Sequence, residues 1–225
     1  MNNEKKNNEL VRVILAFLGT MAGCIGVRAF NIYVLMSLPL GARIVSMIVV
    51  YWLIALIPII IMLIDKDKLT DYGFKREKMG NQILAGLGVG IAMSVVLTLI
   101  PHLAGLGNYV DNGNRYLFLW QFIFEFVYCI ISVAFTEDFV FRGLLYEKIR
   151  RIGNSEIAAV IGSSLLFGFF HILNGNLIQV GMTALIGLFF CLCRLKIKNC
   201  STLSLIIAHG VYDALISVWI FVFAG

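Results

Sequence analysis

Charged residues are scarce in this sequence. Only 14% of its 225 residues are Asp, Glu, Lys or Arg, whereas 60% are hydrophobic. A soluble domain of this size has about 25% charged and about 45–50% apolar residues. The composition therefore excludes an ordinary soluble globular domain. The net charge of +5 is small and lies in short loops, so it gives no reason to expect a nucleic-acid partner.

Several familiar structural and catalytic motifs are also missing. The five cysteines are odd in number and show no zinc-type pairing, so we interpret them as small packing residues. The sequence has no His-Glu-x-x-His metalloprotease helix. Ser163 and Ser164 do not stand in a Gly-x-Ser-x-Gly nucleophile elbow. Because no repeat or separate soluble domain is visible, we expect residues 1–225 to form one integral membrane domain.

Long apolar runs are present instead. Most hold about 18 or more residues, enough for an α-helix to cross a bilayer core about 30 Å thick. They are too long and too uniformly apolar for barrel strands, and a helix satisfies its own backbone hydrogen bonds in lipid. We therefore predict an all-α, polytopic transmembrane helix bundle of seven to eight spans. The seven clear spans are Leu10–Val27, Ile44–Ile64, Gln82–Gly105, Leu117–Ile149, Glu156–Ile172, Leu177–Cys193 and Ser201–Ala224. The short stretch Ala29–Leu40 could be a re-entrant or interfacial helix, or an eighth span.

Positive charge is distributed unevenly between the connections. Fourteen of the eighteen Lys and Arg residues lie at or before the start of the first span, or at or after the ends of the second, fourth and sixth spans. The opposite connections hold only Arg28, Arg43 and Arg115. The positive-inside rule therefore predicts a cytoplasmic N-terminus and, with seven spans, an external C-terminus. The Lys-, Asn- and Ile-rich composition hints at a bacterial plasma membrane.

Ionisable residues interrupt the fourth span. Such residues are costly inside a membrane and are usually functional. Asp138 and Arg142 are spaced i,i+4, so they share a helix face and are predicted to pair. Glu137 points about 100° away around the helix, and should be available to another helix.

Histidines lie on two further spans at a similar depth. The fifth span ends at His171, and the seventh carries His209 and Asp213 on one face. At about 1.5 Å per residue from the basic ends, these residues and Glu137 lie roughly 15–25 Å into the membrane. The same count places Glu125 near the outer surface, where we expect an exposed carboxylate. The polar residues of three helices are thus predicted to meet in one layer.

Three interpretations of this layer differ in function. Buried carboxylates and histidines can join helices by hydrogen bonds without any catalysis. Proton relays in transporters use the same residue types, but no inverted repeat or matched pair of broken helices is visible. We favour an active site, because a packing role does not need two histidines and a carboxylate at one depth.

The polar motifs resemble those of a known family. The order and spacing of Glu137-Asp138-x-x-x-Arg142, Phe167-x-x-x-His171 and His209-x-x-x-Asp213 look like the three-motif signature of the CAAX protease and bacteriocin-processing family (CPBP, or Abi). The run Leu69-Thr-Asp-Tyr-Gly-Phe-Lys-Arg76 resembles the family's cytoplasmic loop before the third span, so the resemblance covers roughly residues 65–220. Two positions differ from the commonest pattern: Asp138 replaces Glu, and Asp213 replaces Asn.

The resemblance implies an intramembrane endopeptidase that acts on a membrane-associated or hydrophobic peptide or protein. Glu137 with His171 could activate water as a general base. His209 could stabilise the tetrahedral oxyanion, with Asp213 orienting its ring. The family was long classed as metalloproteases, and His171, His209 and Glu137 would in principle supply a zinc set, but we favour a mechanism without a metal or other cofactor. The alternative function is a catalytically silent bacteriocin self-immunity, scaffold or transport protein.

Overall fold

The computed structural model describes residues 3–111, 113–174 and 176–223, and these form helices and short connections with no strand among them. Ala224, the predicted end of the last span, lies outside the described residues. Within them, seven helical segments are long and apolar enough to cross a membrane, which confirms the predicted all-α polytopic bundle. The segments are Asn3–Ser37, Leu40–Ile64, Met79–Val110, Leu119–Gly153, Glu156–Leu173, Leu177–Lys196 and Thr202–Phe223.

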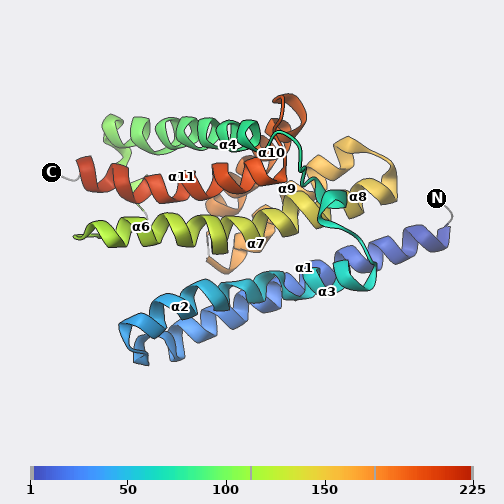
Figure 1. The fold of residues 1–225 in the computed structure, drawn as a ribbon, viewed down its shortest axis with the longest axis horizontal. Coiled ribbons are helices and arrows are strands. Elements are labelled where there is room, and N and C mark those ends of the chain that lie inside the picture. The colour runs from blue at the N-terminus through green and yellow to red at the C-terminus, as the bar shows by residue number, and fades with distance from the viewer. Residues whose placement is uncertain (1–2, 112, 175, 224–225) are drawn as a thin grey trace.

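The first two segments form an antiparallel hairpin, which we call the N-terminal arm. It consists of α1 (Asn3–Tyr33), η1 (Leu35–Ser37), α2 (Leu40–Tyr51), η2 (Trp52–Ala55) and α3 (Leu56–Ile64). Figure 1 shows the arm along one edge of the molecule, in blue. The stretch Ala29–Leu40 is not an eighth span, because it contains the last turn of α1 and the tight connection through η1. A Cβ on Gly23 would lie 2.2 Å from the backbone oxygen of Leu53, so this glycine lets α1 pack directly on η2.

A single long helical segment lies beside the arm and carries the first motif. It consists of α6 (Leu119–Tyr128), the π-helical stretch η6 (Cys129–Ala134), α7 (Phe135–Asp138), the π-helical stretch η7 (Phe139–Leu145) and α8 (Tyr146–Gly153). Every residue from 136 to 148 is buried. π-Helical turns are rare and often occur at functional sites. The central position of this segment therefore brings its polar residues within reach of helices on both sides.

The remaining helices cover the other side of this segment. They are α4 (Met79–Ser94), η4 (Val95–Leu99), η5 (His102–Leu106), α5 (Gly107–Val110), α9 (Glu156–Phe170), η8 (His171–Asn174), α10 (Leu177–Lys196) and α11 (Thr202–Phe223). Figure 1 shows α11 between α4 and α6. A Cβ on Gly86 would lie 2.5 Å from the Ser204 backbone oxygen, and one on Gly90 would lie 2.6 Å from that of Ala208. These small residues bring α4 close to α11, the helix that carries the third motif.

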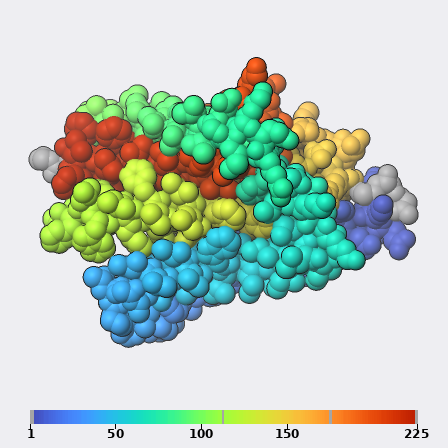
Figure 2. Space-filling model, viewed as in Figure 1, coloured from blue at the N-terminus to red at the C-terminus, as the bar shows by residue number. Residues whose placement is uncertain are grey.

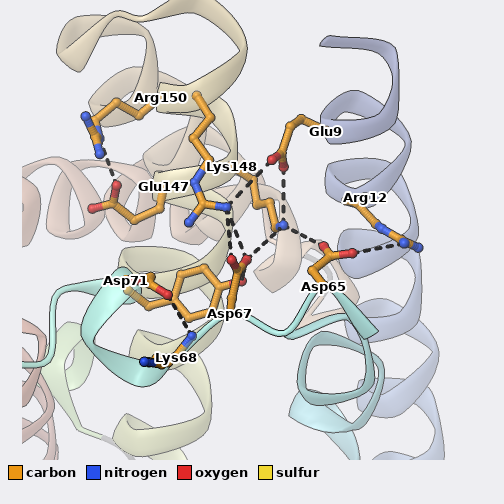
Figure 3. A network of polar contacts seen from close by, with 11 residues as sticks. Glu9, Arg12, Asp65, Asp67, Lys68, Asp71, Glu147, Lys148 and Arg150 are labelled. Carbon is orange, nitrogen blue, oxygen red and sulfur yellow. Dashed lines mark hydrogen bonds and ion pairs between the residues drawn. The ribbon is translucent and has the colours of Figure 1, made fainter. Parts of the chain in front are cut away.

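One end of the molecule is held together by ion pairs, and we call it the basic end. Figure 3 shows Lys148 of α8 reaching three carboxylates of the N-terminal arm and the connection after it. The Nζ atom lies 3.3 Å from Glu9, 2.6 Å from Asp65 and 3.2 Å from Asp67. Arg151 lies 3.1 Å from the same Asp67 carboxylate. The arm is thus joined to α8 by a network of opposite charges.

The connection after α3 crosses from the arm to α4 at this end, and its teal atoms cover the junction in Figure 2. It contains η3 (Leu69–Tyr72), whose last residue is fully buried. The Tyr72 hydroxyl donates to Asp67 at 2.6 Å, and the Tyr72 carbonyl accepts from the Thr202 hydroxyl at 2.7 Å. Burial alone would raise the pKa of the Asp67 carboxyl, but the Tyr72 hydrogen bond and the Lys148 charge outweigh it and the pKa lies below its ordinary value. This loop therefore joins the arm, α8 and α11.

Candidate functional site

Glu137 lies at the centre of the polar layer, on α7, and is only 3% exposed. The hydroxyl of Tyr51, at the end of α2, donates to Glu137 Oε1 at 2.6 Å. The Tyr51 ring packs edge-on against Tyr128, with 5.8 Å between the ring centroids. The prediction that Glu137 would find its partner on another helix is confirmed. One carboxylate oxygen is held, and the other is available for a further contact.

Glu137 and His171 line the same cavity, which has a volume of about 190 Å³. Its walls come from α1, the α2–η2 junction, α7 and the end of α9, and its lining residues are Cys24, Val27, Arg28, Asn31, Tyr51, Ile54, Glu137, Phe170 and His171. The His171 Nδ1 atom lies 2.9 Å from the Phe167 carbonyl oxygen. Because a carbonyl oxygen only accepts, Nδ1 carries a proton, and in the neutral ring Nε2 is then an acceptor. The cavity therefore presents a carboxylate oxygen and an imidazole nitrogen that can both accept a proton or a hydrogen bond.

Asp138 joins two other motif residues. Its Oδ1 atom lies 3.1 Å from Arg142 Nη1, so the predicted i,i+4 pair is confirmed. Its Oδ2 atom lies 3.1 Å from His209 Nδ1, a contact that the sequence analysis did not anticipate. Asp213 faces the other ring nitrogen of His209, at 3.4 Å from Nε2. His209 is therefore held between two carboxylates, and Asp138 makes the closer contact.

Phe167 packs among the remaining motif residues. The Arg142 guanidinium lies over the Phe167 ring, 3.8 Å from its centroid, in a cation–π contact. The same ring has its centroid 4.8 Å from that of His171 and 6.2 Å from that of His209. One aromatic side chain thus spaces the two histidines and stabilises the buried cation. This contact explains why a phenylalanine stands four residues before His171.

The structure does not bring together Glu137, His171 and His209, the three residues that the sequence offered as possible zinc ligands. Among the described residues, no group of three or more His, Cys, Asp and Glu side chains could hold a metal ion. Glu137 and His171 share the cavity, whereas His209 is held between Asp138 and Asp213. The arrangement of these residues does not fit a shared zinc ion, so we derive no step through one.

Several residues of the site were missed because they lie on the N-terminal arm, before the motifs. Cys24, Arg28 and Tyr51 line the cavity, and the Arg28 Nη1 atom also donates to the Leu173 carbonyl at 2.7 Å. A tyrosine within an apolar span or an arginine at its end is ordinary in a membrane helix. No spacing in the sequence links these residues to Glu137. Only their contacts across helices reveal them.

Glu125 does not have the exposed position that we expected. It is 7% exposed, and it accepts hydrogen bonds from the Tyr116 hydroxyl at 2.6 Å and the Asn114 amide at 3.0 Å. The residues before α6 fold back over the helix, and they cover this carboxylate. Glu125 is therefore a structural anchor on α6, and it is not among the residues that line the cavity.

The comparisons with known proteins point to one family. Residues 118–215 match the protein-family model described as type II CAAX prenyl endopeptidase Rce1-like. This range contains all three motifs and every catalytic candidate, but it does not include the N-terminal arm, which precedes it in the sequence. Neither the search of curated proteins nor the search of solved structures found a match.

Proposed function

We propose that this chain is an intramembrane endopeptidase, and that it hydrolyses a peptide bond with a water molecule activated by Glu137. The match of residues 118–215 to the family model of type II CAAX prenyl endopeptidases supports this proposal. The observation that carries the proposal is the cavity shared by Glu137 and His171, in which Tyr51 holds one oxygen of the carboxylate. The substrate is a membrane-associated or hydrophobic peptide. The basic end faces the cytoplasm, in keeping with the positive-inside rule.

The first step is the attack of water on the scissile carbonyl carbon. The free oxygen of Glu137 takes one proton from the water, and His171 Nε2 accepts a hydrogen bond that orients it. The new carbon–oxygen bond turns the carbonyl oxygen into an oxyanion. The carbon–nitrogen bond then breaks, and protonated Glu137 returns its proton to the leaving amine. Protons therefore balance within the site, and no metal is required.

His209 stabilises the oxyanion in this mechanism by donating from Nε2. Its Nδ1 atom is oriented by Asp138, which Arg142 in turn holds. Asp213 faces Nε2, so its contact with this nitrogen must be replaced by the contact of the nitrogen with the substrate oxygen. This assignment differs from the sequence-based one, in which Asp213 alone oriented the ring.

Cleavage of a membrane peptide by the purified protein tests this function. General-base catalysis contributes about 10²–10⁴-fold in rate, so Glu137→Gln should lose activity by at least this factor and keep its fold. Glu125→Gln is a matched control, because it neutralises another buried carboxylate of the same helical segment outside the cavity. Full cleavage activity of Glu137→Gln would rule out the glutamate mechanism. No cleavage by the unmodified protein would instead favour the catalytically silent immunity function.

Chelation after exhaustive dialysis separates this mechanism from a metal-dependent one. The proposed steps use only side chains and water, so activity should persist. Loss of cleavage with a chelator, and recovery with stoichiometric zinc, would contradict this mechanism. Glu137, His171 and His209 would then be assigned as ligands of a metal site that forms with the substrate.

A further inference from the structure

The catalytic cavity is closed toward the basic end by close packing within the N-terminal arm. A Cβ on Gly19 would lie 2.4 Å from Ile57 Cβ, and Gly23 approaches the Leu53 backbone still more closely. These contacts leave no channel between α1 and the helix that returns beside it. Ala16 of α1, one turn nearer the basic end than Gly19, is fully buried.

Buried apolar residues and the ion network complete this closure. Ala16, Ile61 and Leu145 belong to one core cluster between α1, α3 and the α8 side of the central segment, and none is more than 3% exposed. Beyond them, Lys148 is 1% exposed and joins carboxylates of the arm and the connection after it. A peptide entering from the basic end would have to displace both layers.

The opposite side of the cavity is lined by exposed polar residues. Arg28 and Asn31 both line the cavity and are exposed. Arg28 lies sixteen residues beyond Arg12 on the continuous helix α1, which is about 24 Å at 1.5 Å per residue. Arg12 is paired with Asp65 at the basic end. Across a hydrocarbon core about 30 Å thick, Arg28 therefore lies near the opposite membrane surface.

The α9 segment ends at this same rim. Its span, Glu156–Leu173, has 18 residues, whereas the central segment Leu119–Gly153 has 35. Arg28 donates to the carbonyl of Leu173, so α1 and the end of η8 meet beside the cavity. His171 lies within this last turn, and it is only half-buried.

We infer that the cavity receives its substrate from the membrane face opposite the basic end. The substrate class is then a membrane-associated peptide whose scissile bond is presented on that face, and with a cytoplasmic basic end this means an exported peptide. The cleavage part of this inference rests on the proposed function, whereas the access route rests only on the packing of the arm and the position of Arg28 and Asn31.

Sided cysteine labelling of the full chain in membrane vesicles tests the route without a substrate. In a Cys24→Ala background, whose other cysteines are buried, Asn31→Cys reports the cavity rim and Arg76→Cys reports the basic end. The probe is a membrane-impermeant sulfonated maleimide, applied to right-side-out and to inverted vesicles. Asn31→Cys should be labelled in one preparation and Arg76→Cys in the other, with loss of each signal when the vesicles are reversed.

Two results would overturn the inference: labelling of both positions from the same face, or no labelling of Asn31→Cys from either face. A second experiment uses the protein with its native Cys24. A small charged methanethiosulfonate should reach this cysteine only from the face that labels Asn31→Cys. Access of this reagent to Cys24 from the basic end would also overturn the route. If labelling is sided as expected but Glu137→Gln still cleaves peptides, the access route holds and the proposed mechanism fails.

Discussion

At the scale of single residues, Glu137 depends on a hydroxyl group supplied by the N-terminal arm. Tyr51→Phe removes the 2.6 Å hydrogen bond to its carboxylate and leaves the ring in place. Hydrogen bonds to charged groups contribute about 1.5–3 kcal/mol, which corresponds to roughly a ten- to hundredfold effect. We expect this loss in kcat with little change in KM, because Tyr51 acts through the base. Steady-state kinetics measure kcat and KM separately and so check this prediction.

Tyr128→Phe is the control for this substitution. Tyr128 packs against the Tyr51 ring and would lose a hydroxyl in the same region. Its kcat should stay near that of the unmodified protein. Equal losses in the two variants would show that both act through packing, and Tyr51 would then have no positioning role.

The two aspartates around His209 should respond differently to the same change. Asp138 is fully buried and balances Arg142, so Asp138→Asn leaves a buried cation without its counter-charge. Breaking a buried pair in this way costs about 3–5 kcal/mol. Asp213 is 28% exposed at its side chain, and an amide can keep its contact with the ring, so Asp213→Asn should retain both fold and activity. Melting temperatures and cleavage rates of the two variants check this, and similar destabilisation of both would contradict it.

Sequence spacing predicted the contacts of this site that lie within one helix. Asp138 with Arg142, and His209 with Asp213, are four residues apart, and helical geometry alone brings each pair together. The contact of Asp138 with His209 and that of Tyr51 with Glu137 join residues more than seventy positions apart. Such contacts depend on how helices pack, and no periodicity in a single sequence encodes that packing.

At the scale of helices, the α4–α11 interface depends on two glycines of α4. Gly90→Ala would bring a Cβ to 2.6 Å from the Ala208 backbone oxygen, one residue before His209. The helices must separate, so we expect a lower melting temperature and weaker activity. Gly88→Ala is the control on the same helix, because nothing lies within 4 Å of its Cβ position. Its stability should be unchanged or slightly higher, since alanine favours a helix. A normal melting temperature for Gly90→Ala would contradict the packing argument.

Most helices were predictable because a span must be long and apolar in lipid. The prediction was left open where the chain turns, and it was wrong where the chain folds back. Ala29–Leu40 resembled a short span because the end of α1 is itself apolar, and only its packing beside α2 shows that it is a connection. The burial of Glu125 was missed because a count of depth along a helix contains no information on the segment that precedes it.

At the scale of the whole molecule, the ion network holds the arm against the helices that carry the motifs. Lys148→Met leaves Glu9, Asp65 and Asp67 without their shared cation, although Arg12 still pairs with Asp65, and Arg151 still pairs with Glu9 and Asp67. We expect faster hydrogen exchange in α1 and α3, no change in α11, and reduced cleavage because Tyr51 belongs to the arm. Lys196→Met removes an exposed lysine from the same end and should have no such effect. Unchanged exchange in α1 after Lys148→Met would show that the apolar contacts suffice.

The same network should persist in mild acid. The folded-state pKa of Asp67 lies below its ordinary value of 3.8, so its stabilising contribution is present above that value and is lost as the pH falls below it. The protection factors of the α1 amides, which correct exchange for its intrinsic dependence on pH, should therefore be the same at about pH 5 as near neutrality.

The two π-helical stretches that flank α7 determine how this protein tolerates changes in length. A π turn closes its hydrogen bond one residue later than an α turn, so a single deletion within η6 or η7 can be absorbed by conversion of a wide turn into an ordinary one. The two ends of the span then rotate relative to each other while the helix stays continuous. The four residues of α7 form ordinary α-helical turns and contain no wide turn that could absorb a deletion. A deletion there therefore moves Glu137 and Asp138 out of alignment with their partners. Single-residue insertions and deletions in homologous chains should therefore fall in the wide turns and leave the short segment between them at constant length.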